Sequence, residues 1–195
     1  MRILVILAHP KRDSFNAALQ KAVCEGLRAA GHLTDVIDLY AEGFDPVMRG
    51  AELDALGTGR PPADTAAYQR RILQSQGLVL VFPVWWFGIP AILKGFIDRV
   101  FEEGFAFRFE SDGSVRGLLT LKKALVLSTT GAGASPYRRF GFARPLKDAF
   151  DEWTLKLCGL RTVRHIFFYG APTIQPAARA EYLRKAKKLG LTFFR

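Results

Sequence analysis

The sequence predicts an α/β fold in which five parallel strands form one sheet with helices on both faces. Five apolar segments of strand length alternate along the chain with five segments of helical periodicity. This alternation favours a parallel sheet, because right-handed crossovers place the helices against its faces. At 195 residues with 49% hydrophobic content, the chain is long enough for one sizeable core and short for two. We therefore expect a single domain over residues 1–195.

The expected strands are short apolar runs bounded by turn residues. The first, RILVILA, is nearly continuous in its hydrophobicity, which is typical of a strand covered on both faces. The strands are expected at residues 2–8, 33–39, 78–82, 124–129 and 162–168.

Between the strands, apolar residues recur with helical spacing. The first helix begins at Ser14, with Asp13 or Ser14 as its cap, and ends at Gly31. The third begins at Pro90, because proline is favoured in a first helical turn. The other helices are expected at residues 63–75, 144–158 and 176–189. Residues 40–61 are expected to form a long irregular connection, and connections of that length are often functional.

The net charge of +10 is spread unevenly. Residues 1–104 contain 11 Lys and Arg against 12 Asp and Glu, whereas residues 105–195 contain 17 against 6. Such a field attracts phosphate-bearing ligands, nucleic acid or anionic membranes. No basic cluster belongs to a recognised nucleic-acid-reading motif, so we expect no nucleic-acid binding.

The cysteines and histidines do not indicate a metal site. Cys24 and Cys158 lie in apolar helical patterns and have no second ligand at metal spacing, so we expect buried thiols. His9, His32 and His165 are scattered along the chain. The sequence also shows no Ser/His/Asp or Cys/His arrangement for nucleophilic catalysis.

The longest uncharged segment, residues 72–93, approaches the length of a membrane span. It contains Pro83, Gly88 and Pro90, which interrupt a helix, so we expect a strand, a loop and a helix and no membrane insertion. The N-terminal residues lack the features of a secretory signal. A cytoplasmic location is the expectation that follows.

Three unusual segments follow predicted strands, and in open parallel sheets ligands bind beyond the carboxyl ends of the strands. The first segment, His9 to Asn16, leads directly into a helix N-terminus, whose free N–H groups and dipole suit a phosphate. Lys11 and Arg12 add positive charge. The alternative is an ordinary turn with a Ser cap, and the segment lacks the glycine fingerprint of dinucleotide folds.

The second segment brings three aromatic residues together. Trp85, Trp86 and Phe87 lie between Pro83 and Gly88, in a loop too rich in aromatic residues for all of them to be buried. A flat, electron-rich ligand would suit them. Core packing or a dimer interface is the alternative interpretation.

The third segment follows the fourth strand and is rich in glycine. Gly131 and Gly133 allow close approach of the backbone to a ligand. Thr129, Thr130 and the Tyr137 hydroxyl supply further donors, although a plain glycine-rich turn is the alternative. The three segments together match the parts of a flavin: the first suits its phosphate, the aromatic residues suit its ring, and the donors of the third suit the edge of the ring. Reduced flavin carries negative charge at that edge, which fixed donors stabilise.

The motifs LAHPKRDSFNAAL, FPVWWFGIPAILKGFIDRVFEEGFAF and STTGAGASPY resemble those of NAD(P)H:quinone oxidoreductases of the DT-diaphorase type, within the flavodoxin-like fold. The resemblance runs in register from residue 2 to about residue 140. It implies a doubly wound sheet of order 2-1-3-4-5, a bound flavin, and a homodimer with each site at the interface.

The resemblance also implies roles for individual residues. The pyrophosphate and ribityl loop corresponds to His9, Ser14, Phe15 and Asn16. The loop against the isoalloxazine corresponds to Pro83, Val84, Trp86 and Phe87, beside Trp85. The turn that faces the pyrimidine edge corresponds to Thr129, Thr130, Gly131 and Ala132. Tyr137, with Gly131, is the expected stabiliser of reduced flavin.

The chain departs from the mammalian pattern at three positions. Ala143 stands where those enzymes have a His, so a His/Tyr relay is incomplete. Phe107 and Phe109 stand where two substrate-pocket tyrosines lie, which keeps the apolar wall and removes the hydroxyls. The long C-terminal extension of the mammalian forms is also missing, and shorter bacterial relatives include potassium-efflux regulators and FMN proteins.

We therefore expect a flavin-dependent NAD(P)H dehydrogenase that reduces a quinone or a similar small acceptor in two hydride-transfer steps. The resemblance favours FAD, with FMN open, and the donor is NADPH or NADH. The competing hypothesis is a flavin-bound regulatory or electron-transfer module with little turnover, such as an ancillary subunit of a potassium efflux system.

Overall fold

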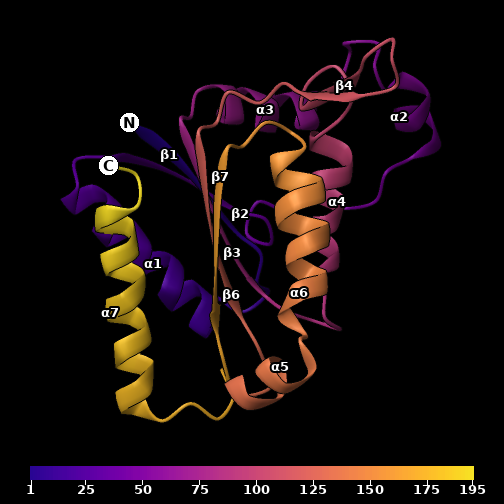
Figure 1. Cartoon of the computed structure of the whole chain (residues 1–195). Coiled ribbons are helices and arrows are strands. Elements are labelled where there is room, and N and C mark those ends of the chain that lie inside the picture. Colours follow the sequence, from indigo (N-terminus) through magenta and orange to yellow (C-terminus); the bar gives the residue numbers. More distant parts are fainter.

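The computed structural model describes residues 1–195, and a parallel sheet of five strands lies at its centre (Figure 1). The sheet has the order β2-β1-β3-β6-β7, and every neighbouring pair is parallel. Its strands are β1 (Arg2–Leu7), β2 (Leu33–Asp38), β3 (Gly77–Pro83), β6 (Lys123–Thr129) and β7 (Thr162–Phe168). Counted along the chain within this sheet, the order is 2-1-3-4-5, so the predicted topology is confirmed.

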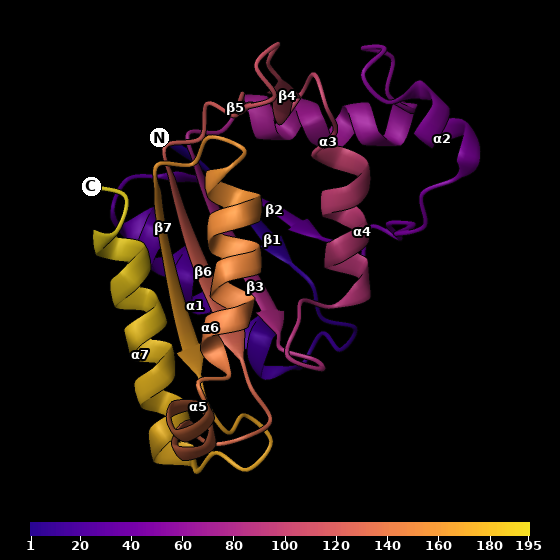
Figure 2. The ribbon, with the colours of Figure 1, turned by 45° about the vertical axis from the view of Figure 1, so that its right-hand side comes forward.

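Helices cover both faces of the sheet (Figures 1 and 2). On one face lie α1 (Phe15–Ala29) and α7 (Pro176–Thr192). On the other face lie α3 (Ala63–Leu73), α4 (Ala91–Val100), and the continuous helix formed by α6 (Ala143–Leu146) and η1 (Lys147–Lys156). The central strands are buried on both sides, which is why their sequences are continuously apolar.

Two glycines allow α1 and α7 to pack closely. A Cβ added to Gly26 would lie 2.0 Å from the Lys187 carbonyl oxygen, and one added to Gly190 would lie 2.3 Å from the Val23 carbonyl oxygen. A larger side chain at either position would push the helices apart. The α1 cap is Ser14, whose Oγ accepts a hydrogen bond from the Ala17 N–H at 3.1 Å.

The expectation of an irregular connection over residues 40–61 is wrong in part, because it contains the short helix α2 (Gly50–Ala55). Arg99 on α4 is buried and holds this segment in place. Its guanidinium donates to the Asp45 carbonyl oxygen at 2.6 Å and to the Glu52 and Asp64 carboxylates. These contacts order the segment from outside it, so its own sequence carries no sign of them.

Three further features were not predicted. An antiparallel hairpin, β4 (Phe107–Phe109) with β5 (Val115–Gly117), follows α4, and the helix α5 (Ala134–Phe140) follows β6. The predicted helix 144–158 has wide π winding in η1. Its hydrogen bonds span five residues, as from the Leu157 N–H to the Glu152 carbonyl oxygen at 3.2 Å.

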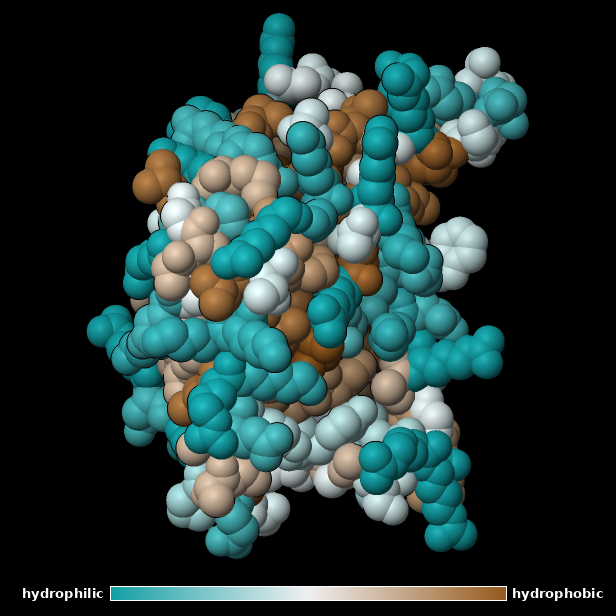
Figure 3. Space-filling model, turned by 60° about the vertical axis from the view of Figure 1, so that its left-hand side comes forward, coloured by the Kyte–Doolittle hydropathy of each residue, from teal (hydrophilic) through white to brown (hydrophobic).

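Both cysteines are buried, as predicted. Burial raises the pKa of Cys24, and it raises that of Cys158 to about 11, so both thiols stay protonated near neutral pH. None of the helices combines the length and the hydrophobicity needed to cross a bilayer. Figure 3 shows one face of the molecule, on which hydrophilic side chains predominate and hydrophobic ones form small patches.

Candidate functional site

The three segments singled out in the sequence meet at the carboxyl ends of the strands. A cavity of about 450 Å³ lies there, with walls from the turns that follow β1, β3, β6 and β7. The residues that line it are His9, Lys11, Ser14, Phe15, Asn16, Pro83, Val84, Trp85, Thr129, Thr130, Gly131, Ala171 and Pro172. Asn16, Trp85 and Gly131 therefore share one cavity although they lie far apart in sequence.

The turn after β1 supplies hydrogen-bond donors to the cavity. The N–H groups of Phe15 and Asn16, in the first turn of α1, have no acceptor within the chain. His9 accepts the Lys11 N–H on Nδ1 at 3.0 Å. Burial lowers the pKa of His9, so the ring is neutral near neutral pH and carries its proton on Nε2, ready to donate.

Asn16 connects the first turn to the third. It is 3% exposed, and its Nδ2 donates to the Thr129 Oγ1 at 2.9 Å. Its Oδ1 is buried and has no hydrogen-bond partner, which is costly for a polar atom. A hydroxyl of a ribityl chain would satisfy this acceptor, so the residue fits a flavin.

The turn after β6 leaves a run of backbone donors free. The N–H groups of Gly131, Ala132 and Gly133 have no acceptor within the chain. The Thr130 hydroxyl, expected as a donor to the ligand, instead donates to the Ala132 carbonyl oxygen at 2.7 Å and so shapes the turn. The free N–H groups suit the electron-rich edge of a flavin ring.

The aromatic loop after β3 is a tight turn with strained backbone. Trp85 and Gly88 exchange two backbone hydrogen bonds, of 3.1 and 3.0 Å. Trp86 and Phe87 between them have φ of 49° and 59°, a region that costs non-glycine residues about 1–3 kcal/mol each. Trp86 is 96% exposed, which agrees with the expectation that not all the aromatic residues are core residues.

Tyr137 on α5 lies beside the cavity and outside its lining. Its ring is buried and contacts Phe142 edge-on at 5.9 Å and Tyr169 at 5.3 Å. Burial raises the pKa of Tyr137, and the nearby Tyr169 adds to the shift. Phe142 also lies 4.8 Å from Phe87, so an aromatic wall continues from the loop after β3 to Tyr137.

Of the predicted site residues, Trp86, Phe87, Ala132 and Tyr137 lie outside the lining of this cavity, and two more lie in another part of the molecule. Phe107 and Phe109 are on β4, in a separate hollow of about 500 Å³ along α4 and η1. Within one chain they do not meet the cavity at the carboxyl ends. Ala143, where a His was noted as missing, begins α6.

Sequence reasoning missed three residues of the cavity wall. Ala171 and Pro172 follow β7, and Lys11 was noted only for its charge. The Ala171 N–H donates to the Thr130 carbonyl oxygen at 2.9 Å, which holds the turn after β7 against the turn after β6. The position of this turn, at the carboxyl end of a predicted strand, was the signal that could have identified it.

The structure also contains a Ser/His/Asp arrangement that the sequence did not reveal. The Ser128 Oγ lies 2.8 Å from His165 Nε2, and His165 Nδ1 lies 2.9 Å from Asp151 Oδ1. All three are buried in the core, and none lines a described cavity. The network joins β6, β7 and η1, and no substrate can reach the serine as it stands.

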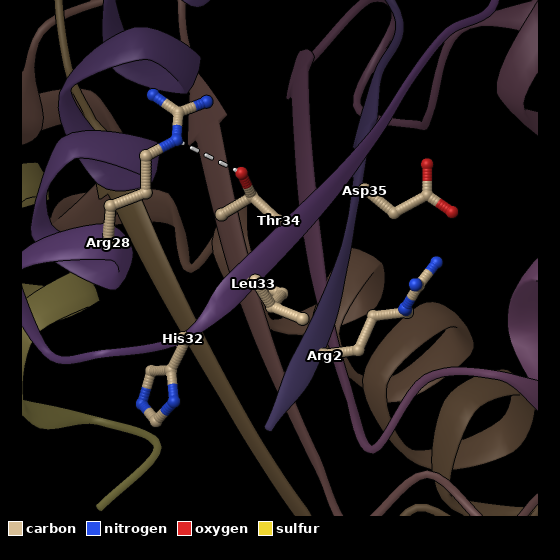
Figure 4. A pocket seen from close by; sticks show the side chains of 6 residues that line it. All are labelled: Arg2, Arg28, His32, Leu33, Thr34 and Asp35. Carbon is tan, nitrogen blue, oxygen red and sulfur yellow. Dashed lines mark hydrogen bonds between the residues drawn. The ribbon is translucent and has the colours of Figure 1, made fainter.

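A third hollow, of about 490 Å³, lies at the amino ends of β1 and β2 (Figure 4). Some of its polar groups are engaged, since Arg28 Nε donates to the Thr34 Oγ1 at 3.2 Å and Asp35 pairs with Arg71 at 2.7 Å, whereas the buried His32 Nε2 has no hydrogen-bond partner. Figure 4 shows Arg28 and Thr34 on one side of β2 and Asp35 on the other. The side chains do not converge on one ligand, so the cavity at the carboxyl ends is the better candidate.

Comparisons with known proteins agree with this geometry. A family model described as a flavodoxin-like fold matches residues 1–189. The chain is 33% identical over 207 residues to the NAD(P)H dehydrogenase (quinone) 1 of Cavia porcellus, covering 96% of this chain and 75% of that protein. It is 31% identical over 194 residues to the ribosyldihydronicotinamide dehydrogenase (quinone) of Mus musculus, covering 87% and 81%.

Solved structures show the same likeness. The NAD(P)H:quinone oxidoreductase from Methanothermobacter marburgensis superposes with a TM-score of 0.91 at 27% identity, covering 99% of this chain and 98% of that chain.

Proposed function

The chain belongs to the flavodoxin-like fold family, with NAD(P)H:quinone oxidoreductases among its homologues, and from this premise we propose that it is a flavin-dependent NAD(P)H dehydrogenase that reduces quinones. The 195 residues act as one flavin-binding domain. One observation carries the proposal: three turns distant in sequence form one cavity that offers unsatisfied backbone N–H groups and the unpartnered Asn16 Oδ1.

The turns divide the binding of the flavin among them. The first turn of α1, with the His9 Nε2–H and the charge of Lys11, holds the phosphate. Asn16 binds the ribityl chain. Pro83, Val84 and the aromatic loop lie against the ring. A bound flavin would supply the hydride-transfer chemistry between the donor and the acceptor.

The side chains and backbone of the protein orient this chemistry and stabilise charge. The N–H groups of Gly131 and Ala132 point fixed dipoles at the ring edge where negative charge develops. Tyr137 holds its proton on the phenol oxygen throughout the neutral range, because its pKa is raised. It is therefore a hydrogen-bond donor during the reaction, without the His partner that position 143 lacks.

The identity of the hydride donor and the identity of the flavin are also proposals. We favour NADPH or NADH as the donor, although one relative is named for ribosyldihydronicotinamide. We favour FAD over FMN from the resemblance to the DT-diaphorase type.

We also propose that the protein is a homodimer. An exposed apolar surface supports this, formed along α4 and η1 by Phe109, 60% exposed, and Trp153, 73% exposed, together with Ile97 and Phe107. A surface of this kind on a globular protein indicates an interface. The resemblance implies that each site lies at the dimer interface, and a second copy placed on this surface would bring its Phe107 and Phe109 to that interface.

Rapid mixing tests the proposal. Flavin-loaded protein mixed with NADPH or NADH should lose its visible absorbance, and a quinone added afterwards should restore it. Absorbance that persists with both donors contradicts the proposed dehydrogenase activity. Bound flavin with very slow reduction instead supports the regulatory or electron-transfer module.

A further inference from the structure

Two arginines beside the cavity have no acidic partner. Arg138 and Arg139 follow Tyr137 on α5, both are exposed, and neither forms a salt bridge, whereas Arg144 nearby pairs with Asp148 at 3.4 Å. The chain has no Asp or Glu from residue 113 to residue 147. The positive charge of α5 is therefore uncompensated on the helix that directly follows the cavity-lining turn after β6.

Aromatic contacts connect Arg139 to the aromatic loop after β3. Its guanidinium lies 5.3 Å from the centroid of the Phe140 ring. Phe140 stacks on Phe142 at 5.3 Å and an interplanar angle of 24°, and Phe142 contacts both Phe87 and Tyr137. The Phe140 ring is nevertheless 60% exposed, so a continuous aromatic surface extends from the aromatic loop to an exposed ring with a cation over it.

Arg138 and Arg139 are consecutive residues of α5, and consecutive side chains project about 100° apart around a helix. The two guanidinium groups therefore leave α5 in different directions. Such a pair suits a ligand that carries more than one phosphate, because guanidinium groups bind phosphate oxygens with planar, charge-assisted hydrogen bonds.

We propose that Arg138, Arg139 and Phe140 bind the adenylate half of the hydride donor, with the arginines on its phosphate groups and the phenylalanine against the adenine ring. This inference rests on the proposed function and narrows it: the donor is a phosphate-bearing dinucleotide, and NADPH is preferred over NADH. A donor that ends at the nicotinamide riboside gains nothing from this surface.

Three donors with different phosphate content test the proposal. The flavin-loaded double variant Arg138→Gln/Arg139→Gln is compared with the wild type and with Arg184→Gln/Lys188→Gln. This control removes two exposed charges from α7. Each phosphate group that loses its guanidinium partner should lower kcat/KM about tenfold, which corresponds to about 1.4 kcal/mol. With NADPH, the test variant loses two such contacts, so its kcat/KM should fall about a hundredfold.

With NADH the fall should be about tenfold, and with reduced nicotinamide riboside the value should not change. The control variant should follow the wild type with all three donors. An equal fall with all three donors, or an unchanged value with NADPH, overturns the proposal.

A binding measurement keeps this test separate from the proposed function. If no donor reduces the flavin in any variant, the enzyme hypothesis fails, and calorimetry with 2′,5′-ADP still tests the surface. The expected result is at least a tenfold rise in Kd in the test variant and no change in the control. Equal affinity in the two variants overturns the proposed site.

Discussion

The unpartnered oxygen of Asn16 gives the sharpest prediction about the cavity. In the Asn16→Leu variant, a side chain of similar shape replaces the amide. The apoprotein loses the 2.9 Å hydrogen bond to Thr129, which leaves the buried Thr129 hydroxyl without a partner at a cost of about 1–3 kcal/mol, and it also loses the buried unsatisfied acceptor of Asn16, whose cost is of the same size. The two costs offset each other, so the free energy of unfolding of the apoprotein should change by less than about 2 kcal/mol.

The flavin affinity of the variant should be lower. In the wild type, a hydroxyl of the ligand donates a hydrogen bond to the Asn16 Oδ1 and removes the cost of leaving it unsatisfied. In the variant, the same hydroxyl finds no acceptor at this position. The binding free energy of the flavin should therefore weaken by about 1–3 kcal/mol, which raises its Kd about fivefold to 150-fold. Denaturant unfolding of the apoprotein measures the stability, and quenching of flavin fluorescence on titration measures the affinity.

Thr65 provides a matched control. Its Oγ1 is also buried without a partner, on α3 and away from the cavity. Thr65→Val breaks no hydrogen bond of the hydroxyl, so it should leave the apoprotein at least as stable, and it should leave the flavin affinity unchanged. If Asn16→Leu destabilises the apoprotein by more than about 2 kcal/mol and binds flavin as the wild type does, the oxygen does not face the ligand and the reasoning fails.

Three further predictions concern packing and titration. Gly26→Ala should lower the free energy of unfolding by about 1–3 kcal/mol, because its Cβ would lie 2.0 Å from the Lys187 carbonyl oxygen, and an unchanged thermal midpoint would contradict this. Asp151→Ala should cost about 2–4 kcal/mol in denaturant unfolding, because it leaves the buried His165 without its partner; a loss below about 1 kcal/mol would show that the network is dispensable. Burial lowers the pKa of His9 from 6.5, so its neutral form stabilises the folded state above pH 6.5, and this contribution is lost as the pH falls below that value. The stability difference between wild-type and His9→Asn apoprotein should change between about pH 5 and about pH 8, and a constant difference would refute the assignment.

The sheet and the position of the cavity were predictable because they depend on short-range patterns. Each central strand is buried on both faces, so its sequence is continuously apolar and identifies it without further information. The order of the elements then places the turns near His9, Trp85 and Gly131 at one edge of the sheet. The exposure of Trp86 followed from the number of aromatic residues in one short loop.

The features that sequence reasoning missed depend on contacts between distant segments. Ser128 and Asp151 lie 37 and 14 residues from His165 and meet it only because β6 pairs with β7 and η1 packs against them. The helix α2 is held by Arg99 from another helix. The hairpin of β4 and β5 is short and half-exposed, so no apolar run marks it.

The cofactor that accompanies the purified protein tests the account most directly. We expect the protein to carry about one flavin per chain, visible in its absorption spectrum and identified by the mass of the released molecule as FAD or FMN. Protein that purifies without a flavin, and that does not bind FAD or FMN when titrated with them, would show that the cavity at the carboxyl ends of the strands is not a flavin site.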